Sequence, residues 1–292
     1  MTMEQTCYQI MAEVIKRDAL NRFHRVHLLA PEIARNVQPG QFVCIFLDDG
    51  DSLKLGTSLG VRFIMPRPFS VSDVEGDEIE IAFSVVGAGT AAMAQLKVGD
   101  SVRLLGPLGK PFSWCDGHDV ALLVGGGMGY APLPFLSKVL VRMGVDVVAI
   151  VGAKSFDELP VRVTNRCVLE VGDVHLAADE FAKHGVPSAI ALEQPHADAF
   201  CGTAVDLTLS WLKANEHRKV AVYACGPKEM LKCLQRILIE RAIYGQFSIE
   251  ERMACGLGLC FGCACKVVEC GKECYKLACV DGPVFDAHML AL

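Results

Sequence analysis

The chain has 292 residues, of which 52% are hydrophobic and 21% are charged, as in a globular protein long enough for more than one domain. A formal net charge of −6 and the lack of a basic run interleaved with aromatic residues argue against a nucleic-acid partner. The N-terminus lacks the basic start and apolar core of a signal peptide, and the longest apolar runs, such as "VDVVAIVGA", are too short for a membrane span. Fourteen cysteines without a secretion signal predict a reducing compartment, so we expect a cytoplasmic protein.

Residues 8–105 are predicted to be rich in short strands. The runs "FHRVHLLA" and "QFVCIFL" are strand-like, and "EIEIAFSVV" alternates before it becomes continuously apolar. Turn signals such as "DDGD" and "KVGD" separate these runs. Many short strands with such punctuation predict a barrel or a sandwich.

The pattern changes after residues 106–119. The stretch 120–144, "VALLVGGGMGYAPLPFLSKVLVRMG", reads as a buried strand, a glycine turn and an amphipathic helix, and 219–242 repeats this order. Strands that alternate with helices predict a parallel α/β sheet. The expected fold is therefore a multidomain α+β protein with a β-barrel over residues 1–112, a parallel α/β domain over 113–245 and a small cysteine-rich segment over 246–292.

The C-terminal segment holds half of the cysteines, in the order Cys255-x4-Cys260-x2-Cys263 with Cys279 further along. This spacing is typical of the plant-type ferredoxin loop that holds a [2Fe–2S] cluster, whereas structural zinc usually takes two close pairs. The intervening glycines permit the positive φ angles that such a loop needs. Cys279 is preferred as the fourth ligand because the turn-like "VDGP" follows it, with Cys270 and Cys274 as the alternatives.

Four other stretches resemble ligand sites but have ordinary structural explanations. The turn "GGGMG" (125–129) follows a strand and opens a helix, yet it departs from G-x-G-x-x-G because Tyr130 occupies the third glycine position. The stretch "CGP" (225–227) ends another parallel strand. "RPFS" (67–70) joins an arginine suited to phosphate with a hydroxyl, and Gly89-Thr90 lies at an expected helix start with Thr90 as the candidate N-cap.

Taken in order, these stretches resemble the ferredoxin–NADP reductase superfamily, and the cysteine segment with "CVDGPVF" resembles the electron-transfer subunits of class 1B dihydroorotate dehydrogenases. The resemblance covers nearly the whole chain, although residues 50–65 have no counterpart in the pattern. It implies FAD in the barrel, NAD in the α/β domain and one [2Fe–2S] cluster in the C-terminal segment.

The resemblance also implies a role for each matching residue. For FAD it implies Arg67, Pro68, Phe69, Ser70, Ala82, Phe83, Ser84, Gly89 and Thr90; for NAD it implies Gly125, Gly126, Gly127, Met128, Gly129, Cys225, Gly226 and Pro227; and for the cluster it implies Cys255, Cys260, Cys263 and Cys279. No acid/base pair or catalytic triad is expected. Asp157 and Glu158 favour NAD and Lys154 would suit NADP, so the sequence leaves this choice open.

A flavin between a two-electron nicotinamide and a one-electron cluster would make the chain an NAD-linked oxidoreductase subunit that transfers electrons. By resemblance, its partner is the FMN-containing catalytic subunit that converts dihydroorotate to orotate in pyrimidine biosynthesis, within a heterotetramer. One alternative is a flavin/iron–sulfur reductase subunit of another complex, such as a ferredoxin:NADP oxidoreductase, a sulfide dehydrogenase or a hydrogenase. The second alternative is a regulatory module that is stabilised by structural zinc, binds a nucleotide and is not an enzyme.

Overall fold

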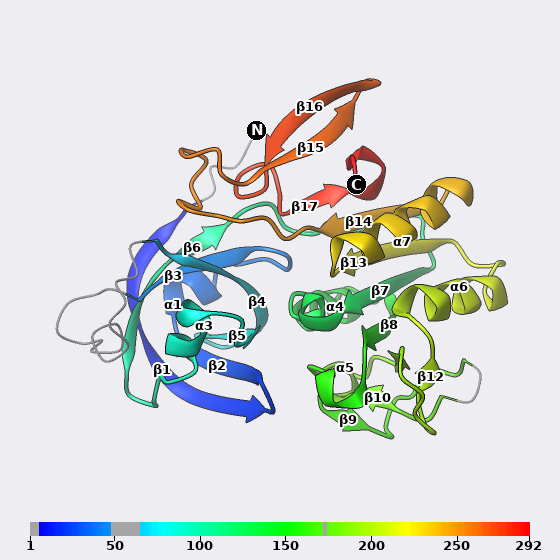
Figure 1. The fold of residues 1–292 in the computed structure, drawn as a ribbon, viewed down its shortest axis with the longest axis horizontal. Helices are drawn as coiled ribbons and strands as arrows, with labels where there is room; N and C mark the ends of the chain where they lie inside the picture. Colours follow the sequence, from blue (N-terminus) through cyan, green and yellow to red (C-terminus); the bar gives the residue numbers. More distant parts are fainter. Residues whose placement is uncertain (1–5, 48–64, 172–173) are drawn as a thin grey trace.

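The computed structural model describes residues 6–47, 65–171 and 174–292. Residues 50–64, which make up nearly all of the unmatched segment, lie outside the described residues. The described chain forms a closed barrel, an open sheet covered by helices and a cysteine-rich segment that lies above both (Figure 1). This arrangement confirms the predicted fold class.

Six antiparallel strands form the barrel in the order β1-β2-β5-β4-β3-β6. Apolar side chains such as Val26, Leu28, Ile79 and Ile81 alternate along the strands and fill the interior. The elements of this part are β1 (Tyr8–Leu20), β2 (Phe23–Leu29), β3 (Phe42–Phe46), β4 (Arg67–Glu75), β5 (Glu78–Ser84) and β6 (Ser101–Leu108), with the short helices α1 (Pro31–Ala34) and α3 (Ala88–Met93).

The second part is a seven-stranded sheet in the order β12-β11-β8-β7-β13-β14-β17. All neighbours pair in parallel except β14 and β17, which are antiparallel. Central strands are buried along their whole length, as expected for a parallel sheet with both faces covered. The strands are β7 (Val120–Gly126), β8 (Asp146–Ala153), β11 (Ser188–Leu192), β12 (Phe200–Cys201), β13 (Val220–Cys225), β14 (Tyr244–Ser248) and β17 (Val284–Asp286).

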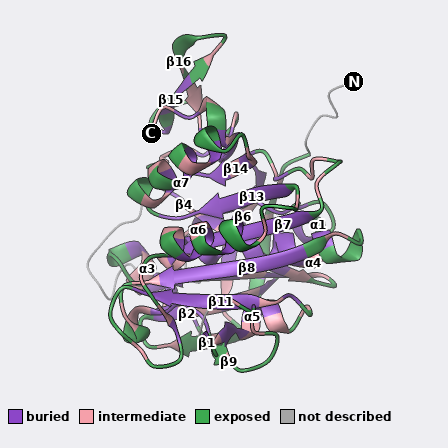
Figure 2. Ribbon diagram, turned by 90° about the vertical axis from the view of Figure 1, so that its right-hand side faces the viewer, coloured by how far each residue is buried: buried purple, intermediate pink, exposed green. Residues whose placement is uncertain are grey.

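Helices cover both faces of this sheet (Figure 2). On one face, Leu122 packs in a core with Trp211 of α6 (Ala204–Ala214) and Leu234 of α7 (Lys228–Glu240). On the other face, Leu123 belongs to a core with residues of α4 (Leu133–Arg142) and α5 (Asp179–Ala182). The strands β9 (Val163–Thr164) and β10 (Ala177–Ala178) form a separate antiparallel pair.

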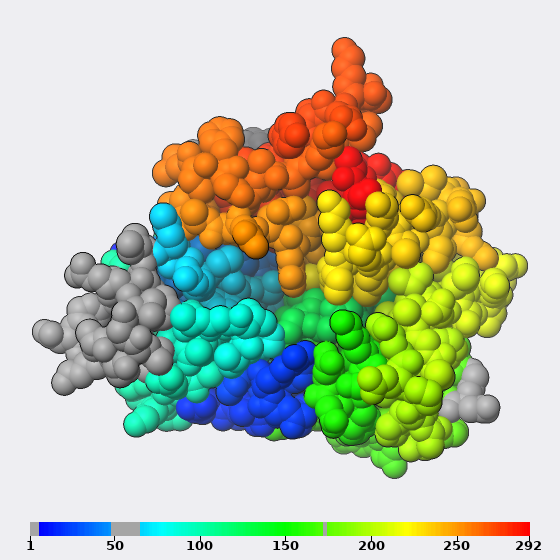
Figure 3. Space-filling model, viewed as in Figure 1, coloured from blue at the N-terminus to red at the C-terminus, as the bar shows by residue number. Residues whose placement is uncertain are grey.

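The cysteine-rich segment leaves the sheet after β14 and returns to it as β17. Between them lies a hairpin of β15 (Ala264–Glu269) and β16 (Lys272–Leu277), which projects from the body of the molecule (Figure 3). The expected boundary between residues 245 and 246 falls inside β14, and the three-part division remains a proposal. Among the described residues, no helix is long and apolar enough to cross a membrane.

Candidate functional site

A cavity of about 340 Å³ opens where the barrel, the α/β domain and the start of the cysteine segment meet. Two neighbouring strands of the barrel, β4 and β5, form one wall. The opposite wall includes Met128 and Cys225 from the α/β domain. Six residues predicted to contact the flavin line the barrel wall: Pro68, Phe69, Ser70, Ala82, Phe83 and Ser84.

Arg67 and Gly89, both predicted to lie at the flavin pyrophosphate, are in direct contact. A Cβ atom at Gly89 would lie 2.7 Å from Arg67 Nε, so any larger residue at this position near the start of α3 would displace the Arg67 side chain. The expectation for Thr90 is wrong in one respect, because Gly87 is the N-cap and Thr90 is the third helical residue. The Thr90 hydroxyl accepts hydrogen bonds from the backbone amides of Val86 and Gly87, at 2.9 and 3.1 Å, and so closes the turn before the helix.

A second cavity, of about 680 Å³, lies at the carboxyl ends of the parallel strands, where open α/β sheets bind ligands. Of the residues predicted for NAD, Gly126, Gly127, Met128 and Pro227 line it. The N-terminal turn of α6 forms another wall. Because Met128 and Ser84 line both cavities, the two are adjacent.

The remaining predicted NAD glycines shape the cavity without lining it. A Cβ atom at Gly129 would lie 2.3 Å from the carbonyl oxygen of Cys225, and one at Gly125 would lie 2.8 Å from Tyr130 Cα. Gly226 approaches the backbone amide of Gly126. The glycine turn after β7 and the "CGP" turn after β13 therefore pack against each other, which is possible because their strands are neighbours.

The sequence analysis missed Glu250 and Glu251, which line the flavin-side cavity. They follow β14 directly, so the rule that ligands bind beyond the carboxyl ends of parallel strands could have identified them. Burial by the surrounding walls raises the pKa of Glu250. Burial, together with the charge of Glu250, also raises the pKa of the Cys225 thiol, which therefore stays protonated at neutral pH.

The predicted cluster ligands form two pairs of sulfur atoms. Cys263 and Cys279 are buried with their Sγ atoms 3.2 Å apart, and Cys260 forms a side-chain hydrogen bond with Cys255. No group of three or more His, Cys, Asp or Glu residues in the described part of the chain is arranged to hold a single metal ion. Two cysteine pairs instead suit a cluster of two iron atoms, each bound by two thiolates.

Backbone amides point at three of these sulfurs. The amide of Leu257 donates to Cys255 at 3.3 Å, that of Gly258 to Cys279 at 3.2 Å and that of Gly262 to Cys260 at 3.5 Å. Burial alone would raise the pKa of Cys255, but the hydrogen bonds from backbone amides outweigh it and lower the pKa to about 7. Cys255 is thus favoured as a thiolate, the form that binds metal, whereas burial and the neighbouring Cys263 raise the pKa of Cys279 to about 12.

The other three cysteines of the segment lie on the hairpin. Cys265 is buried and donates to the carbonyl of Lys276, Cys270 occupies the exposed turn with a φ of 50°, and Cys274 lies near Glu269. Cys279 is therefore the residue that the fold places beside Cys263.

The loop of residues 255–263, called the cluster loop because it carries three of the predicted ligands, packs against the barrel. A Cβ atom at Gly256 would lie 2.7 Å from Cys44 Sγ and 3.9 Å from the ring of Phe42, both from β3. Phe42 also lines the flavin-side cavity. Phe42 therefore borders both this cavity and the loop that carries the cysteines.

Comparison with known proteins agrees with this geometry. Residues 250–291 match the model of the iron-sulfur cluster binding domain of dihydroorotate dehydrogenase B. The chain is 31% identical to the electron transfer subunit of dihydroorotate dehydrogenase B (NAD(+)) of Shouchella clausii, covering 96% of both chains. It is 36% identical to the subunit of the same name from Caldanaerobacter subterraneus subsp. tengcongensis, covering 86% of this chain and 85% of the relative.

Among solved structures, a chain of an NADH-dependent reduced ferredoxin-NADP oxidoreductase superposes with a TM-score of 0.74 at 25% identity, covering 95% of this chain and 88% of that one. A ferredoxin NADP+ reductase from Neisseria gonorrhoeae with bound FAD and NADP shares the fold, with a TM-score of 0.59 at 18% identity over 83% and 98% of the two chains. Because relatives above 30% identity are matched over most of their length, the chain belongs to the family of dihydroorotate dehydrogenase B electron transfer subunits.

Proposed function

We propose that this chain carries electrons between NAD and an FMN-containing catalytic subunit that converts dihydroorotate to orotate. The observation that carries the proposal is the adjacency of three sites: a nucleotide cavity, a flavin-side cavity that shares Met128 and Ser84 with it, and a cysteine loop that packs against Phe42 of the same cavity. Electron transfer between bound groups needs such short separations. The relatives' names supply the reaction, the nicotinamide and the role of electron transfer subunit, and the FMN-containing partner is what the resemblance implies.

Each site has residues suited to its group. When bound, FAD would exchange two electrons with NAD as a hydride and single electrons with the [2Fe–2S] cluster. Arg67, lying against Gly89, would hold the pyrophosphate by charge-assisted hydrogen bonds. Phe69 and Phe83, whose ring centroids are 5.6 Å apart, would form the apolar wall for the ring system. Cys255, Cys260, Cys263 and Cys279 would hold the cluster.

The charges of the nucleotide cavity support NAD over NADP. Glu193, Glu229 and Asp206 line it, and Arg22 is already paired with Glu158 at 2.9 Å. The carboxylate of Asp206 caps α6 by accepting hydrogen bonds from the amide and hydroxyl of Thr203, at 2.9 and 2.6 Å. An additional ribose phosphate would therefore meet negative charge where a free hydroxyl would meet hydrogen-bond acceptors. Lys154 supplies the opposing positive charge.

Exposed apolar side chains around the cysteine loop support docking of the catalytic subunit there. Leu259 is 77% exposed and Phe261 is 70% exposed, and Leu257 and Val280 are also exposed. Apolar patches of this kind mark protein–protein contacts. The same surface would give the electrons released by dihydroorotate a short path to the cluster, and we propose that two copies of each subunit assemble as a heterotetramer.

We also propose a cytoplasmic location for this subunit. All fourteen cysteines are free thiols, seven of them outside the cysteine-rich segment. A reducing compartment maintains thiols in that state and allows a thiolate-bound cluster to form.

The second candidate is a reductase subunit of another flavin-dependent complex. It is favoured by the TM-score of 0.74 to the chain of the NADH-dependent reduced ferredoxin-NADP oxidoreductase, over 95% of this chain. That role would use the same three sites with a different protein partner.

The first experiment is an absorption spectrum of the anaerobically purified chain, with flavin, iron and zinc assayed on the same sample. Flavin bands with broad iron–sulfur absorption, about one FAD and two irons per chain, are expected, and NADH should bleach the flavin more efficiently than NADPH. A colourless zinc protein would refute the electron-transfer role. Copurification with an FMN protein that oxidises dihydroorotate would separate the two candidates.

A further inference from the structure

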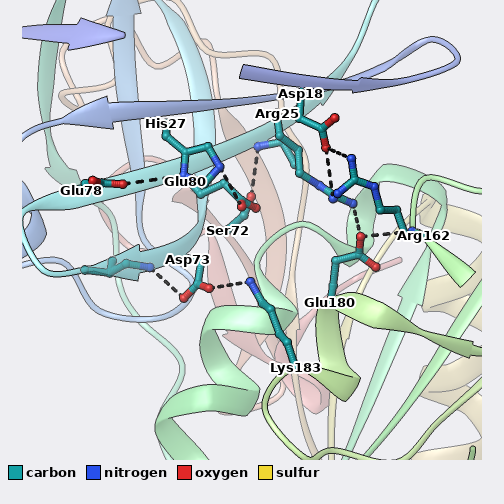
Figure 4. A network of polar contacts seen from close by, with 12 residues as sticks. Asp18, Arg25, His27, Ser72, Asp73, Glu78, Glu80, Arg162, Glu180 and Lys183 are labelled. Atoms are coloured by element: carbon teal, nitrogen blue, oxygen red, sulfur yellow. Dashed lines mark hydrogen bonds and ion pairs between the residues drawn. The ribbon is translucent and has the colours of Figure 1, made fainter. Parts of the chain in front are cut away.

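A buried ion pair connects the barrel to the α/β domain beside the two cavities. Arg25 of β2 donates to Oε1 of Glu180 in α5, in a contact where the two side chains are only 13% and 6% exposed. Figure 4 shows both side chains pointing toward each other, with Asp18 and Arg162 alongside. Glu180 Oε1 also accepts from the backbone amide of Arg162 at 3.1 Å.

Arg25 also reaches the glycine turn that lines the nucleotide cavity. Its Nη2 atom donates to the hydroxyl of Tyr130 at 3.4 Å. Tyr130 is 1% exposed and ends the 3-10 turn Gly127–Tyr130, so its ring is fixed within the core of the α/β domain. The backbone of Tyr130 lies directly against Gly125, so the position of Tyr130 constrains the first residue of the glycine turn.

On the barrel side, Arg25 is paired with the strand that forms the flavin-side wall. In the β2–β5 ladder, Arg25 is opposite Ala82, and Phe23 is opposite Ser84. Side chains directly opposite each other point to the same face of a sheet. Ala82 accordingly packs in the same core as Tyr130. Arg25 thus lies beside the strand that lines the flavin-side cavity, while its guanidinium contacts the turn that lines the nucleotide cavity.

We propose that Arg25 is a positioning residue for hydride exchange between the nicotinamide and the flavin. The inference rests on the proposed function, in which the barrel holds one reactant and the α/β domain holds the other. The separation of the reacting atoms then depends on how the two domains are docked. Arg25 fixes that docking through its contacts with Glu180 and Tyr130. Arg25 itself lines neither cavity.

The test uses the full chain loaded with FAD and cluster, and compares Arg25→Met and Tyr130→Phe with wild type. Stopped-flow bleaching of the flavin by NADH should show a limiting rate about tenfold lower in Arg25→Met, because a displacement on the order of 1 Å has large effects on such steps. The NADH concentration at half-maximal rate should change little. Tyr130→Phe, which removes one oxygen, should show a smaller loss of the same kind.

Hydrogen–deuterium exchange provides a readout independent of turnover. Amides of residues 125–131 should exchange faster in Arg25→Met. The matched control is Arg35→Met, since Arg35 pairs with Asp77 at 3.0 Å, but both side chains are exposed and belong to the barrel. It should leave the limiting rate and the exchange of this turn unchanged.

An unchanged limiting rate per bound flavin in Arg25→Met would overturn the proposal, even if the variant were less stable. If Arg25→Met does not fold, an unchanged rate in Tyr130→Phe would overturn it instead. Failure of NADH to bleach the wild-type chain would contradict the proposed function and is distinguishable from either result.

Discussion

At the scale of single residues, the local environment of each thiol separates candidate ligands from structural cysteines. Cys263 and Cys279 share a buried contact of 3.2 Å, and backbone amides point at the sulfurs of Cys255, Cys260 and Cys279. Cys270, at the exposed hairpin turn, has no such surroundings. Amide hydrogen bonds to sulfur stabilise a thiolate, and at Cys255 they outweigh burial and lower the pKa.

This contrast predicts opposite results for two serine variants. Cys279→Ser should lower the iron content of anaerobically purified protein from about two irons per chain to less than about one, because one iron loses a thiolate. Cys270→Ser should retain the full content, since its thiol lies at the hairpin turn. Iron and acid-labile sulfide assays on both proteins measure this. Equal iron loss in the two variants would contradict the ligand assignment.

At the scale of secondary-structure elements, ion pairs of Asp73 connect strand β4 with the helices α4 and α5. This β4 residue is 8% exposed and forms ion pairs with Lys138 of α4 at 2.9 Å and with Lys183, just after α5, at 2.7 Å. Burial alone would raise the pKa of Asp73, but hydrogen bonds from His184, Lys138 and Lys183 outweigh it and hold the pKa well below its usual range. The barrel is thus docked to the α/β domain by a carboxylate that stays charged.

The depressed pKa predicts a pH-dependent contribution to stability. The contribution is fully present above the unfolded-state pKa, about 3.9 for aspartate, and is lost as the pH falls toward the folded-state value. Asp73→Asn should therefore lower the free energy of unfolding by about 3 kcal/mol at pH 7, and by about 1 kcal/mol less at pH 3, where the unfolded chain takes up a proton while the native carboxylate is still charged.

Urea titrations of wild type and Asp73→Asn at the two pH values measure the difference. The control Asp77→Asn breaks only an exposed pair, and should cost less than about 1 kcal/mol at pH 7. A difference for Asp73→Asn that is the same at both pH values would show that the charge of Asp73 is not the cause.

The sequence predicted these elements unequally well. The cysteine spacing and the buried strands were readable because ligand spacing and hydrophobic periodicity are local properties of the chain. Arg25 and Glu180 are separated by 155 positions, so no local pattern could pair them. Thr90 was misplaced as an N-cap because a glycine, which carries no side-chain signal, occupies that position. Glu250 was missed because its role depends on where β14 ends.

At the scale of the whole molecule, the exposed surface around the cysteine loop is the place where the catalytic subunit would deliver electrons. Phe261 has a φ of 58°, a conformation that bulky residues rarely adopt, and presents its ring to solvent. Exposed aromatic rings in such positions are typical of binding hot spots.

Phe261→Glu should weaken association with the FMN-containing catalytic subunit by about thirtyfold, corresponding to about 2 kcal/mol for an aromatic hot spot. Iron and FAD content should not change, because Phe261 is not a ligand. Met143→Glu is the control, since Met143 is also exposed but follows α4 of the α/β domain. Surface plasmon resonance on the immobilised partner measures both, and equal affinities for Phe261→Glu and wild type would locate the docking surface elsewhere.

The contact of Gly256 with Cys44 and Phe42 has a further consequence for protein engineering. The cluster loop packs on the barrel strand β3 through Gly256. The turn that follows Cys279 is also attached to this region, since the carbonyl of Gly282 accepts a hydrogen bond from the amide of Lys110, just after β6. The iron–sulfur segment is therefore not a portable module. If residues 246–292 were fused to another protein, the loop would lose the barrel residues that it packs against. A functional chimaera would therefore have to include the barrel strand β3 as well.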